Sequence, residues 1–282
     1  AVKIYIMTDM EGVCGVNDHD NWVHNESKNY KLGTELTTLE VNAAIAGFYE
    51  AGAAEIAVID GHGFGGIDRD ILDSRAVYVR ESGYPFALDS TFDGIAWIGQ
   101  HAKAGSEYAH IAHTGWFNIK DYRINGLSLG EFGLMAVCAA YIGVPSIFVS
   151  GDRALCKEAK GLVSRIVTAE VKRGLLAGSG DELDCEEYRG RNLLMENLSY
   201  DEARKRIYEG AKTSLKQLID EPASFILPLI DAPYKREIHY RMCRGCAPGK
   251  AFGCDKGKEI PEHIVISEHE NDLIELLNMP SQ

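Results

Sequence analysis

Short apolar runs rich in β-branched residues alternate with helix-like segments through the first 152 residues of this chain. Four runs read as buried strands, at residues 3–7, 55–59, 95–99 and 145–150, and residues 34–51 repeat apolar side chains with a helical period. Parallel strands need a crossover connection, usually a helix, so this alternation predicts a mostly parallel sheet. We therefore expect a three-layer α/β/α domain over residues 1–152.

The pattern changes after residue 152. Residues 154–176 and 199–218 carry long, charged amphipathic patterns that predict helices. Shorter β-like runs follow Pro222, and residues 267–277 again favour a helix. We expect a smaller α+β domain over residues 153–282 that contributes to oligomer contacts and to substrate access.

The charge balance excludes several classes of partner. Lys and Arg total 29 against 42 Asp and Glu, a formal net charge of −13, whereas nucleic acids and anionic membranes call for clustered basic residues. No apolar run reaches the length that spans a bilayer, and the first residues do not resemble a secretory signal. Seven cysteines, an odd number in a chain of this size, favour reduced thiols. We expect a cytoplasmic protein with no nucleic-acid or membrane partner.

Acidic and histidine side chains stand where predicted strands end or a predicted helix starts. These residues are Asp9, Glu11, His62, His101 and Glu131. The last follows an Asn-Gly pair at 125–126, which is typical of a hairpin turn. Because the carboxyl ends of the strands line the ligand crevice of an open α/β sheet, we expect most of these side chains to converge.

The residue types suit a metal site. Carboxylate oxygens and neutral imidazoles are ordinary zinc ligands. Asp9 and Glu11 are two residues apart, so on an extended strand they point to the same side, and one carboxylate could bridge two cations. Two metals about 3.5–4 Å apart can polarise a carbonyl and activate water together. Each residue alone also fits a turn cap or a hydrogen-bonded loop position, but jointly they predict a metal site.

Two further histidines lie in the segment His110-Ile-Ala-His113-Thr-Gly. Imidazole titrates near neutral pH, so either residue could transfer protons. For His110 we favour a loop histidine that is hydrogen-bonded to the backbone.

Five ordered motifs give the chain a family resemblance. MTDMEGVCG, DGHG, GQHAKAG, AHTG and ING…LGEFGLMA lie between residues 3 and 153 and resemble the zinc D-aminopeptidases of the dipeptide-transport-operon type, the M55 peptidases. The resemblance implies that two zinc ions per chain are held by Asp9, Glu11, His62, His101 and Glu131. It also implies that Asp9 bridges the two ions and that His113 is the catalytic residue.

The same resemblance implies an aminopeptidase that releases the N-terminal residue of short peptides, with a preference for D-residues. It also implies a ring-shaped homo-oligomer, a decamer in the family. The role of His113 stays open, because a zinc pair can activate water near neutral pH. His113 could act as the nucleophile that the family assigns, as an acid or base, or as a donor to the oxyanion.

Two other functions fit the same residues. One is a two-metal hydrolase of a phosphoester or cyclic amide, although phosphate would call for basic residues and the motifs offer only Lys103 and Arg153. The other is a non-catalytic α/β module that binds small peptides. Cys243, Cys246 and Cys254 could form a metal clip or a redox pair, but three sulfurs make a poor zinc site and free thiols are the favoured interpretation.

Overall fold

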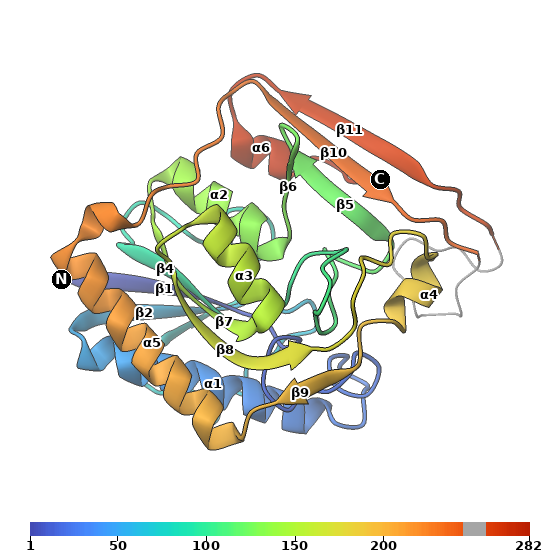
Figure 1. The fold of residues 1–282 in the computed structure, drawn as a ribbon. Coiled ribbons are helices and arrows are strands. Elements are labelled where there is room, and N and C mark those ends of the chain that lie inside the picture. The colour runs from blue at the N-terminus through green and yellow to red at the C-terminus, as the bar shows by residue number, and fades with distance from the viewer. Residues whose placement is uncertain (245–257) are drawn as a thin grey trace.

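The computed structural model describes residues 1–244 and 258–282, and its centre is a seven-stranded sheet (Figure 1). The strand order is β3-β2-β1-β4-β7-β8-β9, and all neighbours are parallel except β8 and β9. The strands are β1 (Val2–Thr8), β2 (Ala53–Asp60), β3 (Val77–Val79), β4 (Gly94–Gln100), β7 (Ser146–Asp152), β8 (Val167–Gly174) and β9 (Met195–Asn197). The predicted mostly parallel sheet is confirmed.

Helices cover both faces of this sheet (Figure 1). On one face, α1 (Tyr30–Glu50) and α5 (Tyr200–Asp220) lie side by side. On the other face lie α2 (Glu131–Ile142) and α3 (Arg153–Leu162). Every residue of β4 is buried between the two layers. Such a strand is apolar on both sides, which explains the continuous apolar runs of the sequence.

A second sheet is antiparallel, with the order β11-β10-β5-β6. Its elements are β5 (Ile119–Ile124), β6 (Leu127–Ser128), β10 (Tyr234–Tyr240) and β11 (His263–His269), and α6 (Leu273–Leu277) packs against β10 and β11. Buried residues of this sheet and of α2 belong to one hydrophobic cluster. The separate antiparallel sheet therefore packs on the large sheet through α2.

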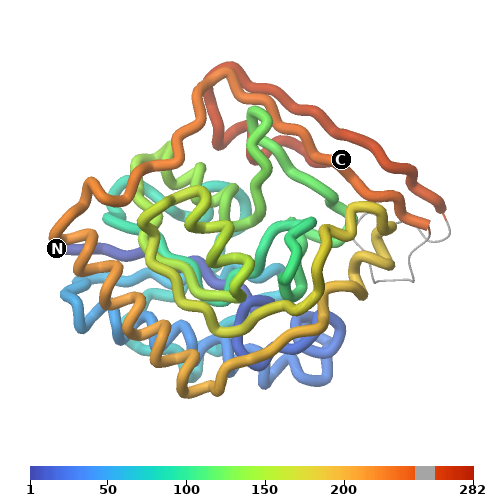
Figure 2. The backbone as a smooth tube through the Cα atoms, viewed as in Figure 1, coloured from blue at the N-terminus to red at the C-terminus, as the bar shows by residue number. Residues whose placement is uncertain are grey.

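Arg236 on β10 fixes the last described residues. Its side chain is 1% exposed and donates hydrogen bonds to the carbonyl oxygens of Leu276, Met279 and Pro280 at 3.1, 3.1 and 2.8 Å. These bonds hold the end of α6 and the residues up to Pro280 against β10. Residue 1 lies at the opposite side of the molecule in the view of Figure 2.

Two helix predictions in the second half of the chain are correct over only part of their length. Residues 154–176 contain nearly all of α3 and then strand β8, in which the apolar residues Ala169 and Val171 are buried while charged residues alternate with them. Residues 267–277 contain the end of β11 and the short helix α6, whose first turn is capped by Asp272. In both cases an amphipathic strand and an adjoining helix lack a Gly or Pro between them, so the combined pattern resembled one helix.

The two sheets draw strands from both sides of residue 152. Strands β8 and β9 extend the large sheet, and the hairpin of β5 and β6 joins the small one. Sheet membership therefore does not follow the expected boundary at residue 152, and the division into two domains stays a prediction. Two short helical segments, α4 (Cys185–Arg189) and a 3₁₀ turn (Pro222–Ser224), complete the described elements.

Two glycines allow the loop after β1 to press against the end of β4. A Cβ atom on Gly12 would lie 1.9 Å from the carbonyl oxygen of Gln100, and one on Gly99 would lie 2.1 Å from that of Asp9. Gly99 also has a φ of +76°, in the region that L side chains rarely adopt. The amide of Gly12 donates to the Gly99 carbonyl at 2.8 Å. Only glycine permits this approach, and it brings the residues after β1 beside those after β4.

Among the described helices, none combines the length and the hydropathy that crossing a bilayer requires. The cysteines of the described residues are free and buried. Cys243 packs in one cluster with Cys185. Cys246 and Cys254 lie outside the described residues.

Candidate metal centre

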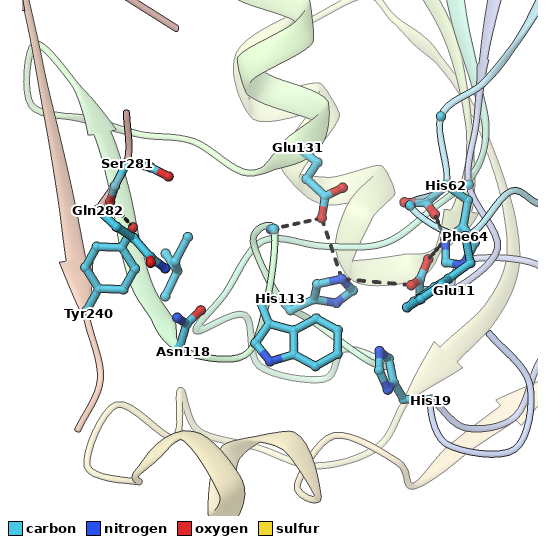
Figure 3. A pocket seen from close by; sticks show the side chains of 16 residues that line it. Glu11, His19, His62, Phe64, His113, Asn118, Glu131, Tyr240, Ser281 and Gln282 are labelled. Carbon is cyan, nitrogen blue, oxygen red and sulfur yellow. Dashed lines mark hydrogen bonds and ion pairs between the residues drawn. The ribbon is translucent and has the colours of Figure 1, made fainter. Parts of the chain in front are cut away.

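The side chains predicted to form a site meet at the carboxyl-terminal edge of the large sheet, and Figure 3 shows four of them, Glu11, His62, His113 and Glu131. They come from five local elements: the loop after β1, which carries two of them, the loop after β2, the residue that follows β4, the loop before β5 and the first turn of α2. The residues brought together are Asp9, Glu11, His62, His101, His113 and Glu131. The convergence follows from the parallel strand order, in which β1 lies between β2 and β4.

Asp9 lies between two groups of ligand atoms. Its Oδ1 is 2.9 Å from His62 Nδ1, and that nitrogen is 3.4 Å from Glu11 Oε2. Its other oxygen, Oδ2, is 3.3 Å from His101 Nε2, and that nitrogen is 2.8 Å from Glu131 Oε2. Each group therefore contains one imidazole nitrogen and two carboxylate oxygens, and the two groups share the Asp9 carboxylate.

Backbone carbonyl groups orient the three imidazole rings. His62 Nε2 lies 2.6 Å from the carbonyl oxygen of Val23, and His101 Nδ1 lies 3.0 Å from that of Ala102. His113 Nδ1 lies 2.7 Å from the carbonyl oxygen of Ile111. A carbonyl oxygen can only accept, so these nitrogens carry the hydrogen. The opposite nitrogen of each neutral ring is then an acceptor, and it faces the carboxylates.

Acceptor nitrogens facing carboxylate oxygens need positive charge between them. The Oε2 atom of Glu11 is buried and accepts no hydrogen bond from the described residues. Burial opposes the charge on Asp9, but hydrogen bonds from His101 and His62, which require each ring to carry a second proton, outweigh it and hold the pKa of Asp9 below its usual range. Burial likewise opposes a charge on His101, yet the Glu131 carboxylate raises the pKa of His101 well above its ordinary value. The donor set therefore fits divalent cations, which would satisfy the same atoms without added protons.

His113 stands beside this cluster. Its Nε2 is 3.6 Å from Glu131 Oε2 and 4.0 Å from Glu11 Oε1. Burial lowers the pKa of His113, and the neighbouring His101 ring lowers it further, so its ring is neutral near pH 7. The carbonyl that orients it belongs to Ile111, which has a φ of +51°. A β-branched residue in this region is strained, and such strain is typical of functional sites.

A cavity of about 530 Å³ opens beside the cluster. The sequence did not predict most of its wall, which includes His19, Phe64, Trp116, Asn118 and Tyr240. In Figure 3, Tyr240 and Asn118 lie on the side of the second sheet, across the cavity from Glu11 and His62. Among these wall residues, only His19 has a recognisable sequence feature, because it stands with His24 in a turn-like segment rich in Asn and Asp.

His110 does not reach the cluster. Its ring is buried, and Nε2 bonds to the carbonyl oxygen of Asn17 at 2.9 Å. The interpretation of His110 as a loop histidine bonded to the backbone is confirmed. His113, three residues later, is the one that faces the site.

Comparisons with known proteins point to one family. A family model described as D-aminopeptidase, of peptidase family M55, matches residues 2–244. A D-aminopeptidase of Bacillus subtilis (strain 168) is 34% identical over 177 residues, which cover 61% of this chain and 64% of that relative. The alignment thus spans a little under two thirds of the relative's length.

A solved structure has the same fold. The zinc-dependent D-aminopeptidase DppA from Bacillus subtilis, a self-compartmentalizing protease, matches with a TM-score of 0.78 and 24% identity. The match covers 98% of this chain and 94% of that one. At this identity the similarity establishes the arrangement of both sheets.

Proposed function

The chain belongs to the D-aminopeptidase family of M55 peptidases, and we propose that it is a zinc-dependent aminopeptidase that removes the N-terminal residue, preferably a D-residue, from short peptides. One observation carries this proposal: two groups of ligand atoms share the Asp9 carboxylate. Two cations with a bridging carboxylate are a common arrangement for amide hydrolysis.

In this proposal each group of ligand atoms would hold one zinc ion. His62 and Glu11 would hold one ion, His101 and Glu131 would hold the other, and Asp9 would contribute a carboxylate oxygen to each. Zinc supplies Lewis acidity, which polarises the scissile carbonyl and makes water a stronger acid. The protein contributes the fixed ring orientations, because the carbonyl oxygens of Val23 and Ala102 hold His62 and His101 with an acceptor nitrogen toward the site.

His113 acts as the general base of the reaction. Its Nδ1–H is held by the carbonyl oxygen of Ile111, so Nε2 presents a lone pair beside Glu131 and Glu11. A neutral imidazole in that position can take a proton from the attacking water. The same tautomer does not suit donation to an oxyanion, which favours the role of base over that of oxyanion donor.

The lining of the cavity lacks the basic side chains that a phosphate usually needs. The described residues that line it include three carboxylates, Asp9, Glu11 and Glu131, and no Lys or Arg. Two zinc ions would offset the charge of these carboxylates, so no side chain of the described lining is left to pair with a phosphoester. Lys103 donates to Ser128 Oγ at 2.6 Å and Arg153 pairs with Glu170 at 2.9 Å, so both basic side chains of the motifs are engaged elsewhere. A phosphoester substrate is therefore disfavoured.

The proposal includes assembly into a homo-oligomer, a ring by family resemblance. Strand β11 lies at an edge of the second sheet, and its Ile264 and Ile266 are 52% and 55% exposed. Exposed apolar side chains on a sheet edge commonly mark an interface. Light scattering of the purified protein would measure the subunit number.

A cytoplasmic location is part of the proposal, because the described cysteines are free thiols.

Metal analysis together with a substrate panel tests the function. The purified protein should contain two zinc ions per chain and release the N-terminal residue from D-aminoacyl dipeptides faster than from the L-forms. Chelation should abolish hydrolysis, and added zinc should restore it. Full zinc content without hydrolysis of any peptide would refute the proposal and favour a binding module.

A further inference from the structure

His19 lines the same cavity as several proposed zinc ligands, and His24 is hydrogen-bonded to it. His24 Nε2 lies 2.8 Å from His19 Nδ1, so one ring donates to the other. Burial lowers the pKa of His19 to about 2 and also lowers that of His24. Both rings are therefore neutral near pH 7, and each carries one hydrogen that can sit on either nitrogen.

His19 reaches into the cavity, and His24 lies behind it. The His19 ring is 4% exposed and packs edge-on against Trp116 and Phe117, with ring centroids 5.1 and 4.7 Å away. Figure 3 places it below Glu11 and His113, with a ring nitrogen on their side. Its centroid is 6.3 Å from that of His113. His24 is only partly buried, so the pair extends from the cavity toward the surface.

The loop that carries the pair is held in place by its own hydrogen bonds. Asp18 accepts from the backbone of Asn21 at 2.7 Å, and Ser27 Oγ donates to the carbonyl oxygen of Asp20 at 2.7 Å. The Ser27 hydroxyl also accepts from the backbone of His24 at 3.2 Å. These bonds fix both rings relative to the cavity.

His19, Asp20 and His24 are close enough to hold a cation, but the surroundings disfavour one. The Arg189 guanidinium already pairs with the Asp20 carboxylate. Arg189 also places a fixed positive charge beside the cluster. The separation of 2.8 Å between the two ring nitrogens is that of a hydrogen bond.

We infer that His19, backed by His24, delivers the proton that the leaving amine needs when the peptide bond breaks. The inference rests on the proposed function, in which the single lone pair of His113 serves as base. Peptide amines are poor leaving groups without a proton, and a group separate from the base can supply it. His19 lines the same cavity as His113, with a ring nitrogen on the side of Glu11 and His113.

The proton transfers balance without any further reactant. The N–H bond at His19 Nε2 breaks as a new N–H bond forms on the leaving nitrogen. At the same time, the bond between the leaving nitrogen and the carbonyl carbon breaks. His19 Nδ1 takes the hydrogen of His24 Nε2, and His24 Nδ1 takes a proton from solvent. Both rings end neutral, each with its hydrogen on the other nitrogen. The net change is the transfer of one proton from solvent to the amine.

The test uses two variants and two substrates with the zinc-loaded enzyme. His24→Phe keeps the ring packing against Phe64 and Trp116 but removes the hydrogen bond to His19. His24→Gln can keep a hydrogen bond but cannot pass a proton on. The substrates are a D-aminoacyl dipeptide and the p-nitroanilide of the same D-residue, whose leaving amine needs far less help from an acid.

For both variants we expect kcat on the dipeptide to fall about 10²-fold with little change in KM, since lost acid catalysis typically costs that much. Hydrolysis of the anilide should change by less than about 3-fold under the same principle, because its leaving group is already good. Zinc content should match wild type. Equal losses on both substrates, or no loss on either, would overturn the inference.

The outcomes separate the inference from the function it rests on. Should His24→Phe fail to fold, His24→Gln alone decides, because its side chain is polar and close in size to histidine. An inactive wild-type protein with two zinc ions would instead overturn the proposed function, and the relay with it.

Discussion

The imidazole rings of His101 and His113 are stacked, with 3.8 Å between their centroids and 13° between their planes. Each ring donates its Nδ1 hydrogen to a nearby backbone carbonyl, that of Ala102 or Ile111. The stack and the two hydrogen bonds leave neither ring free to turn. A proposed zinc ligand and the proposed base are therefore positioned as one unit, and the acceptor nitrogens of both face Glu131.

Replacing Asp9 by Ala should remove the carboxylate that the two groups of ligand atoms share. We expect loss of both zinc ions and of peptide hydrolysis, with secondary structure retained, because the side chain contacts the cluster and not the hydrophobic core. Elemental analysis and circular dichroism measure the two effects. Asp201→Ala, in the first turn of α5, is the control and should keep metal and activity. A fully active Asp9→Ala enzyme would place the site elsewhere.

Replacing His113 by Ala should separate catalysis from metal binding. The proposed ligands remain in this variant, so zinc content should stay at the wild-type level. Loss of the general base should lower kcat by about 10²–10⁴-fold. Steady-state kinetics on a D-aminoacyl dipeptide provide the measurement, and unchanged turnover would exclude His113 from the chemistry.

A methyl group at position 12 should disturb both stability and the site. The Cβ of Gly12→Ala would meet the Gln100 carbonyl oxygen at 1.9 Å, so the loop after β1 must move. Overpacking of this kind costs about 1–3 kcal/mol in unfolding free energy, and the shift of Asp9 should weaken zinc binding.

Gly161 is the matched control, because a Cβ there meets nothing within 4 Å and the residue lies in α3. Gly161→Ala should be neutral or stabilising by up to about 1 kcal/mol. Chemical denaturation of the zinc-loaded proteins compares the two. Equal stability of both variants would contradict the close approach.

Glu40 on α1 should make the protein less stable as pH rises. Burial raises the pKa of Glu40 from 4.5 to about 8, although a hydrogen bond from the Cys14 amide opposes the shift. The folded state then binds a proton that the unfolded chain releases near pH 4.5, so the unfolding free energy falls between pH 4.5 and about 8. Glu40→Gln cannot ionise and should lose less stability over this range.

Thermal unfolding at pH 5 and pH 7 tests this difference, with wild type and Glu40→Gln measured side by side. The range ends at pH 7 because burial lowers the pKa of Lys172 to about 8, and below that pH the lysine is mostly charged in both the folded and the unfolded state. Identical losses in the two proteins between these pH values would show that Glu40 is ionised in the folded state.

The predictable part of the fold is the part that local patterns encode. Strands such as β1 and β4 are buried on both faces, and their apolar runs are visible without knowledge of their neighbours. Most of the proposed zinc ligands closely follow strands β1, β2 and β4, so their convergence follows from parallel pairing. Strand β8 escaped prediction because its charged residues alternate with Ala169 and Val171 and continue the pattern of α3.

The second sheet and the wall of the cavity depend on distant pairing. Residues 119–124 pair with residues 234–240, and the sequence of neither segment predicts which strand it will pair with. His19 and His24 likewise lie in an ordinary polar turn, and only the folded chain brings them to Trp116 and Phe117. The residue types of the proposed metal ligands can be recognised in a single sequence. The residues of the cavity wall that faces them cannot.

The cavity lies at a seam between two independently built walls. Asp9, Glu11 and His62 come from loops that follow strands of the large sheet, whereas Tyr240 and Asn118 come from strand β10 and the approach to β5 in the small one. Substitutions at Tyr240 or Asn118 can thus enlarge, shrink or recharge the space left for a peptide without displacing a proposed zinc ligand. Relatives that share the same hydrolytic residues can therefore differ in the peptides that they accept.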